Sequence, residues 1–290
     1  QAMKFGCYDY LQKPFKLDHL KLIIDRIIEE KKVEDKAALI RKRARGRYKY
    51  EELIGISAPM QQVYELIETV VPQNPMVLIQ GESGTGKELV ARTIHYKSER
   101  RDMPFVPVNC GSIAEGVAED KVVKHVTALI KKVDGGTIYL DEIAELAPAL
   151  RLSLLQALEG EQKAKGIRAR VVAATSRELK DIIDSGAMKK DLFDLLNAVV
   201  IKLPPLRERR EDICLLIHHF IHQACRQQKK RLIGVSPEAL DVIMRYHWPG
   251  NLIQLQNVIE RALALGVQEA IEPDDLPAEI QTFSEISKIG

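Results

Sequence analysis

The feature that most constrains the fold is a glycine-rich segment inside the stretch LIQGESGTGKELVARTIH, residues 78–95. The apolar run MVLIQ at 76–80 predicts a buried strand before it, and a helical pattern runs on from about Lys87 to Tyr96. Glycines let backbone N–H groups approach a phosphate, and the start of a helix adds partial positive charge. A lysine at this spacing reaches the outer phosphates of a nucleotide; the common motif then has Ser or Thr, whereas this chain has Glu88.

The sequence therefore predicts a nucleotide site in two parts. The first part is the phosphate-binding loop with the residue after its lysine, namely Gly81, Glu82, Ser83, Gly84, Thr85, Gly86, Lys87 and Glu88. The second part is the apolar strand in GGTIYLDE, at 135–142, where Asp141 is expected to hold magnesium and Glu142 to orient or deprotonate a water. A chance glycine-rich turn and a solvated pair of acids are the alternatives, and the strand–loop–helix context favours the site over both.

The alternation of strands and helices predicts an α/β fold with a doubly wound, mostly parallel sheet of five strands. Ser57 is expected to cap a helix on which Met60, Val63 and Ile67 share one face. Besides the strand at 76–80, the strand candidates are FVPVN at 105–109, TIYLD at 137–141, RVVAAT at 170–175 and AVVIKL at 198–203.

The strand signals stop after LPPLRERRED at 203–212, and a small all-helical domain is expected to follow. A Ser-Pro-Glu sequence at 236–238 is a helix start with proline in the first turn. Asn251 is expected to cap a later helix, and Trp248, just before it, to act as a packing anchor. The apolar side of that later helix is predicted to hold Leu252, Leu255, Ile259 and Leu263.

Composition and charge exclude several classes of protein. The 290 residues carry a net charge of +2, so no strong global field draws the chain to nucleic acid or to a membrane. No apolar run reaches the roughly 18 residues that a membrane helix needs, and no secretory signal opens the chain. The four cysteines form no CxxC pair, so we expect reduced thiols in a cytoplasmic protein with no membrane partner. The chain begins with Gln1 and not with Met, so we expect it to be a fragment of a longer protein.

Six segments together resemble the AAA+ central domain of bacterial enhancer-binding proteins, the nitrogen-regulator-type activators of sigma-54 RNA polymerase. The segments are EELIGISAPMQQVYELI, GESGTGKELVARTIHYKSERRDMPFVPVNC, GGTIYLDEIAEL, RVVAATSREL, LPPLRERREDI and WPGN, and they cover about residues 50–280. The resemblance implies a P-loop AAA+ fold with a helical lid, ATP or ADP with Mg as cofactors, and self-association as a dimer or a hexameric ring. It implies that Glu88 is the family's own variant. Asn109 would be a polar switch partner of Glu142, and Ile54 would line the adenine pocket.

The first residues, which contain GCYDYLQKPF, are similar to the end of a two-component receiver domain. On this resemblance Lys13 is the phosphate-sensing lysine and Tyr10 the switch aromatic. The expected domains are therefore a receiver tail at 1–15, a linker helix at 16–46, an AAA+ α/β nucleotide-binding domain at 47–212 and a helical lid domain at 213–290.

The chain departs from the family pattern at positions that act on phosphate charge. Lys189 and Leu195 stand where the family has two arginine fingers, which stabilise transition-state charge. Lysine keeps the charge but lacks the guanidinium fork, and leucine has neither. Ile253 stands at the arginine that senses the γ-phosphate in the family, with Gln254 at the neighbouring glutamate.

Two loops are also shorter than in the family. The stretch between Cys110 and Gly135 lacks the Gly-Ala-Phe-Thr-Gly-Ala sequence that contacts sigma-54, and EGEQKAKGIRA at 159–169 is shorter than the family norm. Either the gene has lost these loops or they are missing from this chain alone.

Three hypotheses of function remain open on the sequence. The leading one is the ATP-binding AAA+ module of a two-component response regulator in transcription regulation, with weak or lost hydrolysis and no sigma-54 contact loop. The second is an active ATP-hydrolysing sigma-54-type activator with divergent arginine fingers, and the third is an oligomerisation scaffold that does not use nucleotide. DNA binding by this chain is unsupported, because no helix-turn-helix follows residue 281. His218 and His222 have the spacing of zinc ligands, but a polar helix face is the favoured reading.

Overall fold

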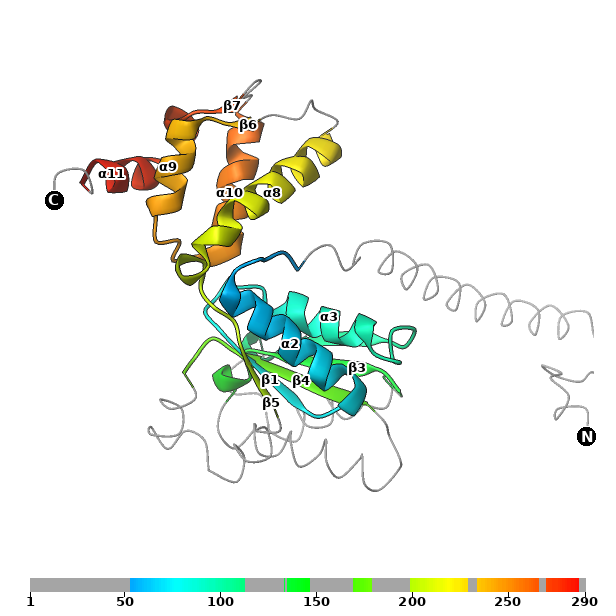
Figure 1. Ribbon diagram of the computed structural model, residues 1–290. Coiled ribbons are helices and arrows are strands. Elements are labelled where there is room, and N and C mark those ends of the chain that lie inside the picture. Colours follow the sequence, from blue (N-terminus) through cyan, green and yellow to red (C-terminus); the bar gives the residue numbers. More distant parts are fainter. Residues whose placement is uncertain are drawn as a thin grey trace, which may run out of the picture. The chain divides into compact units, whose positions relative to one another are not determined.

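The structure is a computed structural model, shown in Figure 1, in which the described residues belong to one compact unit, Glu52–Gly290. The described residues are 53–112, 133, 135–146, 169–178, 199–228, 234–265 and 270–286. Several predictions therefore lie outside them: the receiver tail at 1–15, the linker at 16–46, Lys189, Leu195 and most of the two shortened loops.

Five parallel strands form one sheet in the order β2-β3-β4-β1-β5. The strands are β1 (Val77–Gln80), β2 (Phe105–Asn109), β3 (Thr137–Asp141), β4 (Arg170–Thr175) and β5 (Val199–Lys202). This confirms the predicted five-stranded sheet. Every residue of β1 and β4 is buried, as two-sided cover in a parallel sheet requires. Because β4 pairs with both β1 and β3, the carboxyl ends of these three strands meet at one edge of the sheet.

Two helices cover one face of the sheet, α2 (Ala58–Gln73) and α3 (Lys87–Lys97). Figure 1 shows them side by side, and they contact each other as well as the sheet. Met60, Val63 and Ile67 are buried on α2, which confirms the predicted apolar face.

The lid contains four helices among its described residues, packed around a shared apolar core. They are α8 (Ile213–Gln228), α9 (Pro237–Arg245), α10 (Asn251–Ala264) and α11 (Ala278–Ile286). Trp248 is fully buried in this core, and its indole N–H donates to the carbonyl oxygen of Ile243 at 2.8 Å, as expected of a packing anchor. Ser236 caps α9 by accepting from the N–H of Ala239 at 3.2 Å.

The lid also contains a feature that the all-helical prediction lacks. The short strands β6 (Gly234–Val235) and β7 (Ala270–Ile271) pair in parallel. Two residues in each strand are too few for an alternating pattern, so the sequence carries no periodic signal for this pair.

Two predicted helix caps have other partners in the structure. Ser57 stands at the N-cap of α2, but its hydroxyl donates to the carboxylate of Asp212 at 2.7 Å. The prediction that Asn251 caps α10 is wrong, because Gly250 is the N-cap and Asn251 is the first helical residue, with φ +50°. The side chain of Asn251 instead bonds to residues distant in the chain, which a local rule for caps does not consider.

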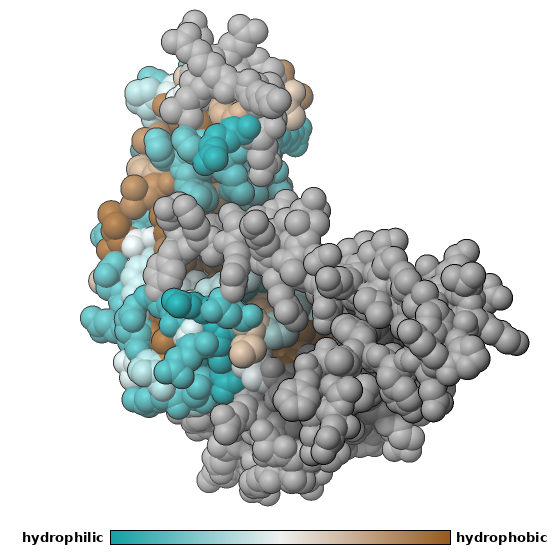
Figure 2. All heavy atoms as spheres, turned by 90° about the vertical axis from the view of Figure 1, so that its right-hand side faces the viewer, coloured by the Kyte–Doolittle hydropathy of each residue, from teal (hydrophilic) through white to brown (hydrophobic). Residues whose placement is uncertain are grey.

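The described residues expose a few large apolar side chains. Among the residues that Figure 2 colours, most are hydrophilic, and hydrophobic ones gather toward the left of the view. The large apolar side chains that are exposed are Ile56, Leu66, Met103, Leu215, Ile253 and Leu265. No helix in the described part of the chain has both the length and the apolar character needed to cross a membrane.

A buried histidine in α3 makes the stability of the fold depend on pH. His95 is fully buried beside Thr137, with 2.9 Å between Nδ1 and the threonine hydroxyl. Burial, together with the nearby arginines, lowers the pKa of His95 from 6.5 to about 4. The folded state therefore keeps this imidazole neutral at pH values where the unfolded chain binds a proton.

We predict that the free energy of unfolding falls as the pH drops from about 6.5 to about 4, because only the unfolded state gains a proton there. Each pKa unit corresponds to about 1.4 kcal/mol, so the loss reaches about 3 kcal/mol at the acid end of this window. Denaturant unfolding of the wild type and of His95→Gln across this range measures the difference in pH slope. His247→Gln, at an exposed position, is the control, and equal slopes for wild type and His95→Gln would contradict the prediction.

Candidate nucleotide-binding site

The glycine-rich loop connects the end of β1 to the start of α3 at Lys87. Gly84 and Gly86 have φ values of +78° and +101°, a region that glycine adopts readily and other residues rarely. The N–H and the hydroxyl of Thr85 both donate to the carbonyl oxygen of Glu82, at 3.3 and 2.8 Å, and close the turn. The result is a tight loop at a helix N-terminus, the geometry that binds phosphate through backbone amides.

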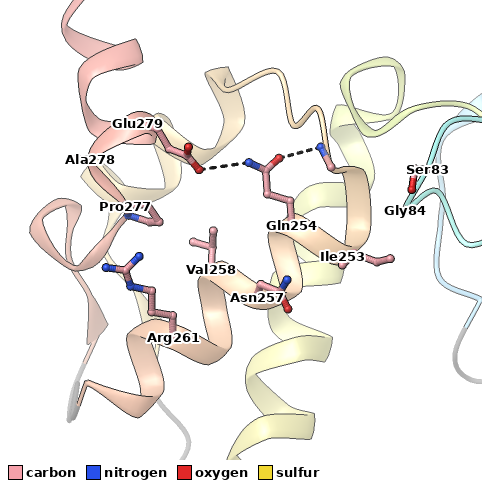
Figure 3. Close-up of a pocket in the computed structure, with 11 residues that line it drawn as sticks. Ser83, Gly84, Ile253, Gln254, Asn257, Val258, Arg261, Pro277, Ala278 and Glu279 are labelled. Carbon is pink, nitrogen blue, oxygen red and sulfur yellow. Dashed lines mark hydrogen bonds between the residues drawn. The ribbon is translucent and has the colours of Figure 1, made fainter.

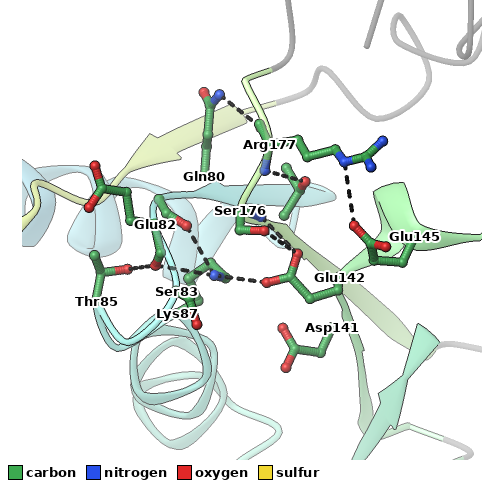
Figure 4. A network of polar contacts seen from close by, with 12 residues as sticks. Gln80, Glu82, Ser83, Thr85, Lys87, Asp141, Glu142, Glu145, Ser176 and Arg177 are labelled. Carbon is green, nitrogen blue, oxygen red and sulfur yellow. Dashed lines mark hydrogen bonds and ion pairs between the residues drawn. The ribbon is translucent and has the colours of Figure 1, made fainter. Parts of the chain in front are cut away.

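The side chain of Lys87 returns across the loop toward the end of β3, as Figure 4 shows. Its ammonium donates to the carbonyl oxygens of Gly81 at 3.0 Å and Glu82 at 3.3 Å. The same nitrogen lies 3.0 Å from the Oε1 atom of Glu142. The two parts of the site predicted from sequence, 55 positions apart at these residues, therefore meet in the fold.

Glu142 follows β3 directly and is held from two sides. Its Oε2 atom accepts from the backbone N–H of Ser176 at 2.8 Å and from the hydroxyl of Ser176 at 2.9 Å. Burial acts to raise the pKa of Glu142, but the Ser176 and Lys87 hydrogen bonds and the lysine charge outweigh it and hold that pKa below its usual value. Glu142 is therefore a fixed, ionised carboxylate at the edge of the sheet, beside the loop lysine.

Asp141 is the last residue of β3 and lies in a concentration of negative charge. The hydroxyl of Tyr139 donates to its Oδ1 atom at 2.9 Å. Burial raises the pKa of the Tyr139 phenol, and the charges of Asp141, Glu88 and Glu142 raise it further. Carboxylate oxygens gathered in this way suit a hard divalent cation. The described residues contain no group of three or more His, Cys, Asp or Glu that could hold a metal, so a cation here would need oxygen ligands from elsewhere.

A cavity of about 240 Å³ lies beside the loop, between it and the lid. Its walls include Ile54, Gly84, Gly86, Leu252, His219 and Gln223. Apolar walls with a few polar groups are typical of a site for a flat organic ring. Burial, followed by the charges of His222 and His218, lowers the pKa of His219, so a neutral imidazole faces this cavity.

Comparison with known proteins agrees with this geometry. The family model of the Sigma-54 interaction domain matches residues 53–202, and that of the AAA+ ATPase lid domain matches residues 207–288. The chain belongs to the Sigma-54 interaction domain family.

Curated relatives of this family align with nearly the whole chain. The chain is 37% identical over 284 residues to "Nitrogen fixation protein AnfA" of Azotobacter vinelandii, covering 92% of this chain and 53% of the relative. It is 34% identical over 300 residues to "Regulatory protein AtoC" of Escherichia coli (strain K12), covering 97% of this chain and 65% of the relative. The chain thus spans between about half and two thirds of the length of these relatives.

Solved structures agree in fold. NtrX from Brucella abortus in complex with ATP is 34% identical, with a TM-score of 0.72 over 98% of this chain and 68% of that one. The same protein in complex with ADP gives a TM-score of 0.71. The RuvB Holliday junction branch migration motor of Thermotoga maritima, at 16% identity and a TM-score of 0.54, shares the fold alone.

The residues that the sigma-54 family resemblance implies have definite places in the structure. Ile54 lines the cavity beside the loop, and Glu88, in the first turn of α3, forms an ion pair with Arg92. Asn109 lies directly opposite Asp141, because β2 pairs with β3 in that register. The roles assigned to these residues, adenine contact for Ile54 and switching of Glu142 for Asn109, stay predictions.

Ile253, in α10, is 58% exposed. It lines the cavity beside the loop and also a second cavity of about 720 Å³, shown in Figure 3. The second cavity lies between the loop, at Ser83 and Gly84, and the face of α10 that carries Gln254 and Arg261. No positive charge stands at position 253 to meet a phosphate.

Sequence reasoning missed three residues that shape the site. Ser176 holds Glu142, and Arg207 and Arg209 bond to the phosphate loop at Glu82 and Thr85. Ser176 directly follows β4, so the rule that functional residues lie at strand carboxyl ends could have found it. Local patterns do not reveal the two arginines, because their partners lie more than a hundred positions earlier, 125 residues from Arg207 and 124 from Arg209.

We predict that Gly84→Ala destabilises the loop and the fold. A Cβ atom at Gly84 would lie 2.4 Å from the backbone oxygen of Gly250, and φ +78° adds about 1–2 kcal/mol of backbone strain for alanine. Thermal and denaturant unfolding should show a loss larger than this strain alone. Gly234→Ala is the matched control, because nothing lies within 4 Å of its Cβ position, and it should cause little change. Equal stability of Gly84→Ala and Gly234→Ala would contradict the prediction.

Proposed function

We propose that the chain is the ATP-binding AAA+ module of a two-component transcription regulator of the sigma-54-dependent class. The observation that carries this is the approach of the Lys87 ammonium to Glu142 at 3.0 Å, which joins the phosphate loop to the carboxylate pair at the end of β3. The relatives support it, since NtrX is described in complex with ATP and with ADP. The receiver tail at 1–15, the linker at 16–46 and self-association in a dimer or hexameric ring are parts of the same proposal.

The residues present fit a nucleotide with its metal ion. The loop from Gly81 to Glu88 would surround the phosphates, and Lys87 would leave Glu142 to reach the outer ones. Asp141 would supply the protein carboxylate to magnesium, which when bound neutralises charge on the phosphate oxygens. Glu142, held ionised by Ser176, would then orient a water as a base.

Hydrolysis on this proposal is weak or lost. The exposed Ile253 brings no charge to the phosphates, where an arginine would stabilise them. Loss of one such charge typically costs several kcal/mol of activation barrier. Nucleotide then acts chiefly as a ligand that sets assembly or the position of the lid, and contact with sigma-54 through the shortened loop is not part of the proposal.

The test of the proposed function is Lys87→Ala. Titration calorimetry with ATP and magnesium should show binding by the wild type and a loss of affinity of at least about tenfold in the variant. Lys202→Ala removes an exposed lysine at the end of β5 and should leave binding unchanged. Absence of binding by the wild type would instead favour the oligomerisation scaffold. Steady-state turnover that rises with protein concentration and is abolished by Lys87→Ala would favour the active ATPase.

A second prediction concerns a variant that places a positive charge at position 253. Ile253→Arg should increase ATP affinity by roughly tenfold, because a guanidinium binds phosphate oxygens with paired hydrogen bonds. It should also raise the rate of ATP hydrolysis measured by phosphate release. Ile253→Met keeps an apolar side chain of similar reach and should behave as the wild type. No gain in affinity or rate for Ile253→Arg would show that position 253 does not act on the phosphates.

A further inference from the structure

The outer side of the phosphate loop is bonded to residues that follow β5. The amide of the Asn251 side chain donates to the carbonyl oxygen of Ser83 at 2.9 Å. The backbone N–H of Leu252 donates to the carbonyl oxygen of Gly84 at 3.0 Å. The guanidinium of Arg209 donates to the carbonyl oxygen of Thr85 at 3.1 Å. Three consecutive carbonyl groups of the loop therefore point to donors outside it.

These bonds also fix the direction of the loop amides. In a trans peptide the C=O and N–H groups point to opposite sides of the chain. Holding the carbonyls of Ser83, Gly84 and Thr85 outward therefore turns the next N–H groups inward. Consistent with this, the N–H of Thr85 donates back to Glu82 within the loop at 3.3 Å. The N–H groups of Gly84 and Gly86 are therefore turned inward, toward the place of a phosphate.

Asn251 is the centre of this outer set of bonds. It is fully buried, and its side-chain oxygen accepts from the N–H of Leu206 at 2.8 Å. Its amide nitrogen donates to Ser83 and, at 3.2 Å, to the carboxylate of Glu82. Glu82 is in turn held by both terminal nitrogens of Arg207, at 2.9 and 2.5 Å. All the hydrogen-bonding groups of the Asn251 side chain thus join the start of α10 and the segment after β5 to the loop.

The charges in this set are fixed as well. The hydrogen bond from Arg207, with a further contribution from Asn251, lowers the pKa of Glu82, so its carboxylate stays ionised. An aspartate at position 251 would place a second carboxylate against it. Asn251 is therefore a position where a change of one atom converts attraction into repulsion without altering side-chain size.

We propose that Asn251, together with the Glu82–Arg207 pair, is a positioning device that sets the amides of the phosphate loop from the lid. Nucleotide affinity then depends on where the start of α10 stands, and a bound nucleotide favours the lid position that keeps these bonds. The proposal rests on the proposed function, because it concerns the same phosphate site. Asn251 contacts no nucleotide on this proposal and acts through the loop alone.

The test compares Asn251→Asp with Asn257→Asp in the full chain. Asn251→Asp keeps the acceptor for Leu206 but removes the donor to Ser83 and opposes the carboxylate of Glu82. Asn257→Asp makes the same change at an exposed position of the same helix. Calorimetry with ATP and magnesium, run well below the unfolding temperature of each protein, should show affinity lower by about tenfold or more for Asn251→Asp alone.

Two further readouts separate positioning from simple loss of fold. Hydrogen exchange of the nucleotide-free protein should be faster in the peptide that contains Gly84 and Gly86 in Asn251→Asp, while the strands exchange as in the wild type. Adding Glu82→Gln to Asn251→Asp should recover part of the affinity, because an amide at position 82 donates to the new carboxylate. If Asn251→Asp does not fold, Arg207→Gln replaces it, with Arg210→Gln, also exposed, as its control.

Each outcome decides between the proposals. A wild type that binds no ATP overturns the proposed function, and this inference with it. A wild type that binds ATP while a folded Asn251→Asp, or Arg207→Gln, binds within about twofold of it overturns this inference alone. An equal loss of ATP affinity in the variant and in its control also overturns this inference alone. Weakening confined to the Asn251 or Arg207 variant, with faster exchange in the loop and recovery in the double variant, supports it.

Discussion

The ion pair between Lys87 and Glu142 is the contact on which the whole site depends. Only 7% of the lysine side chain and 23% of the glutamate side chain are exposed, so both charges lose much of their contact with water. Such a loss is costly unless other polar groups replace the water. Here the carbonyl oxygens of Gly81 and Glu82 do so for the ammonium, and Ser176 does so for the carboxylate. These partners converge because β3, β4 and β1 are neighbours in the sheet.

The second constraint is the close approach of the lid to the loop. Gly84 and Gly250 come so near that a single Cβ atom would prevent it, and the hydrogen bond from Leu252 to Gly84 depends on that approach. Buried polar groups must find partners, and Asn251 satisfies its own by bonding across the two regions. Lid position and loop geometry are consequently coupled, and Ile253, which lines both cavities beside the loop, lies on the same helix as Asn251.

Much of the fold could be predicted from the sequence, and the missed partners of the cap side chains have a common cause. Strands buried on both faces appear as short apolar runs, so β1 and β4 were predicted correctly, and the loop between β1 and α3 has an unmistakable glycine pattern. The caps were harder to predict: Ser57 bonds to Asp212, 155 residues away, and Asn251 bonds to Glu82, 169 residues away. A local rule assigns a polar side chain to the nearest backbone amide, whereas a folded chain offers it partners from any distance.

The sequence by itself determined the strands, the loop and the chemistry of the acids at the end of β3, because each depends on residue types at fixed short spacings. Only the tertiary structure decided which charges meet. The pairing of Lys87 with Glu142, the support of Ser176 and the bonds of Arg207, Arg209 and Asn251 to the loop all join distant segments. Such contacts arise from strand order and from the approach of the lid, and these follow from burial of the whole apolar surface at once, which no single stretch of sequence encodes.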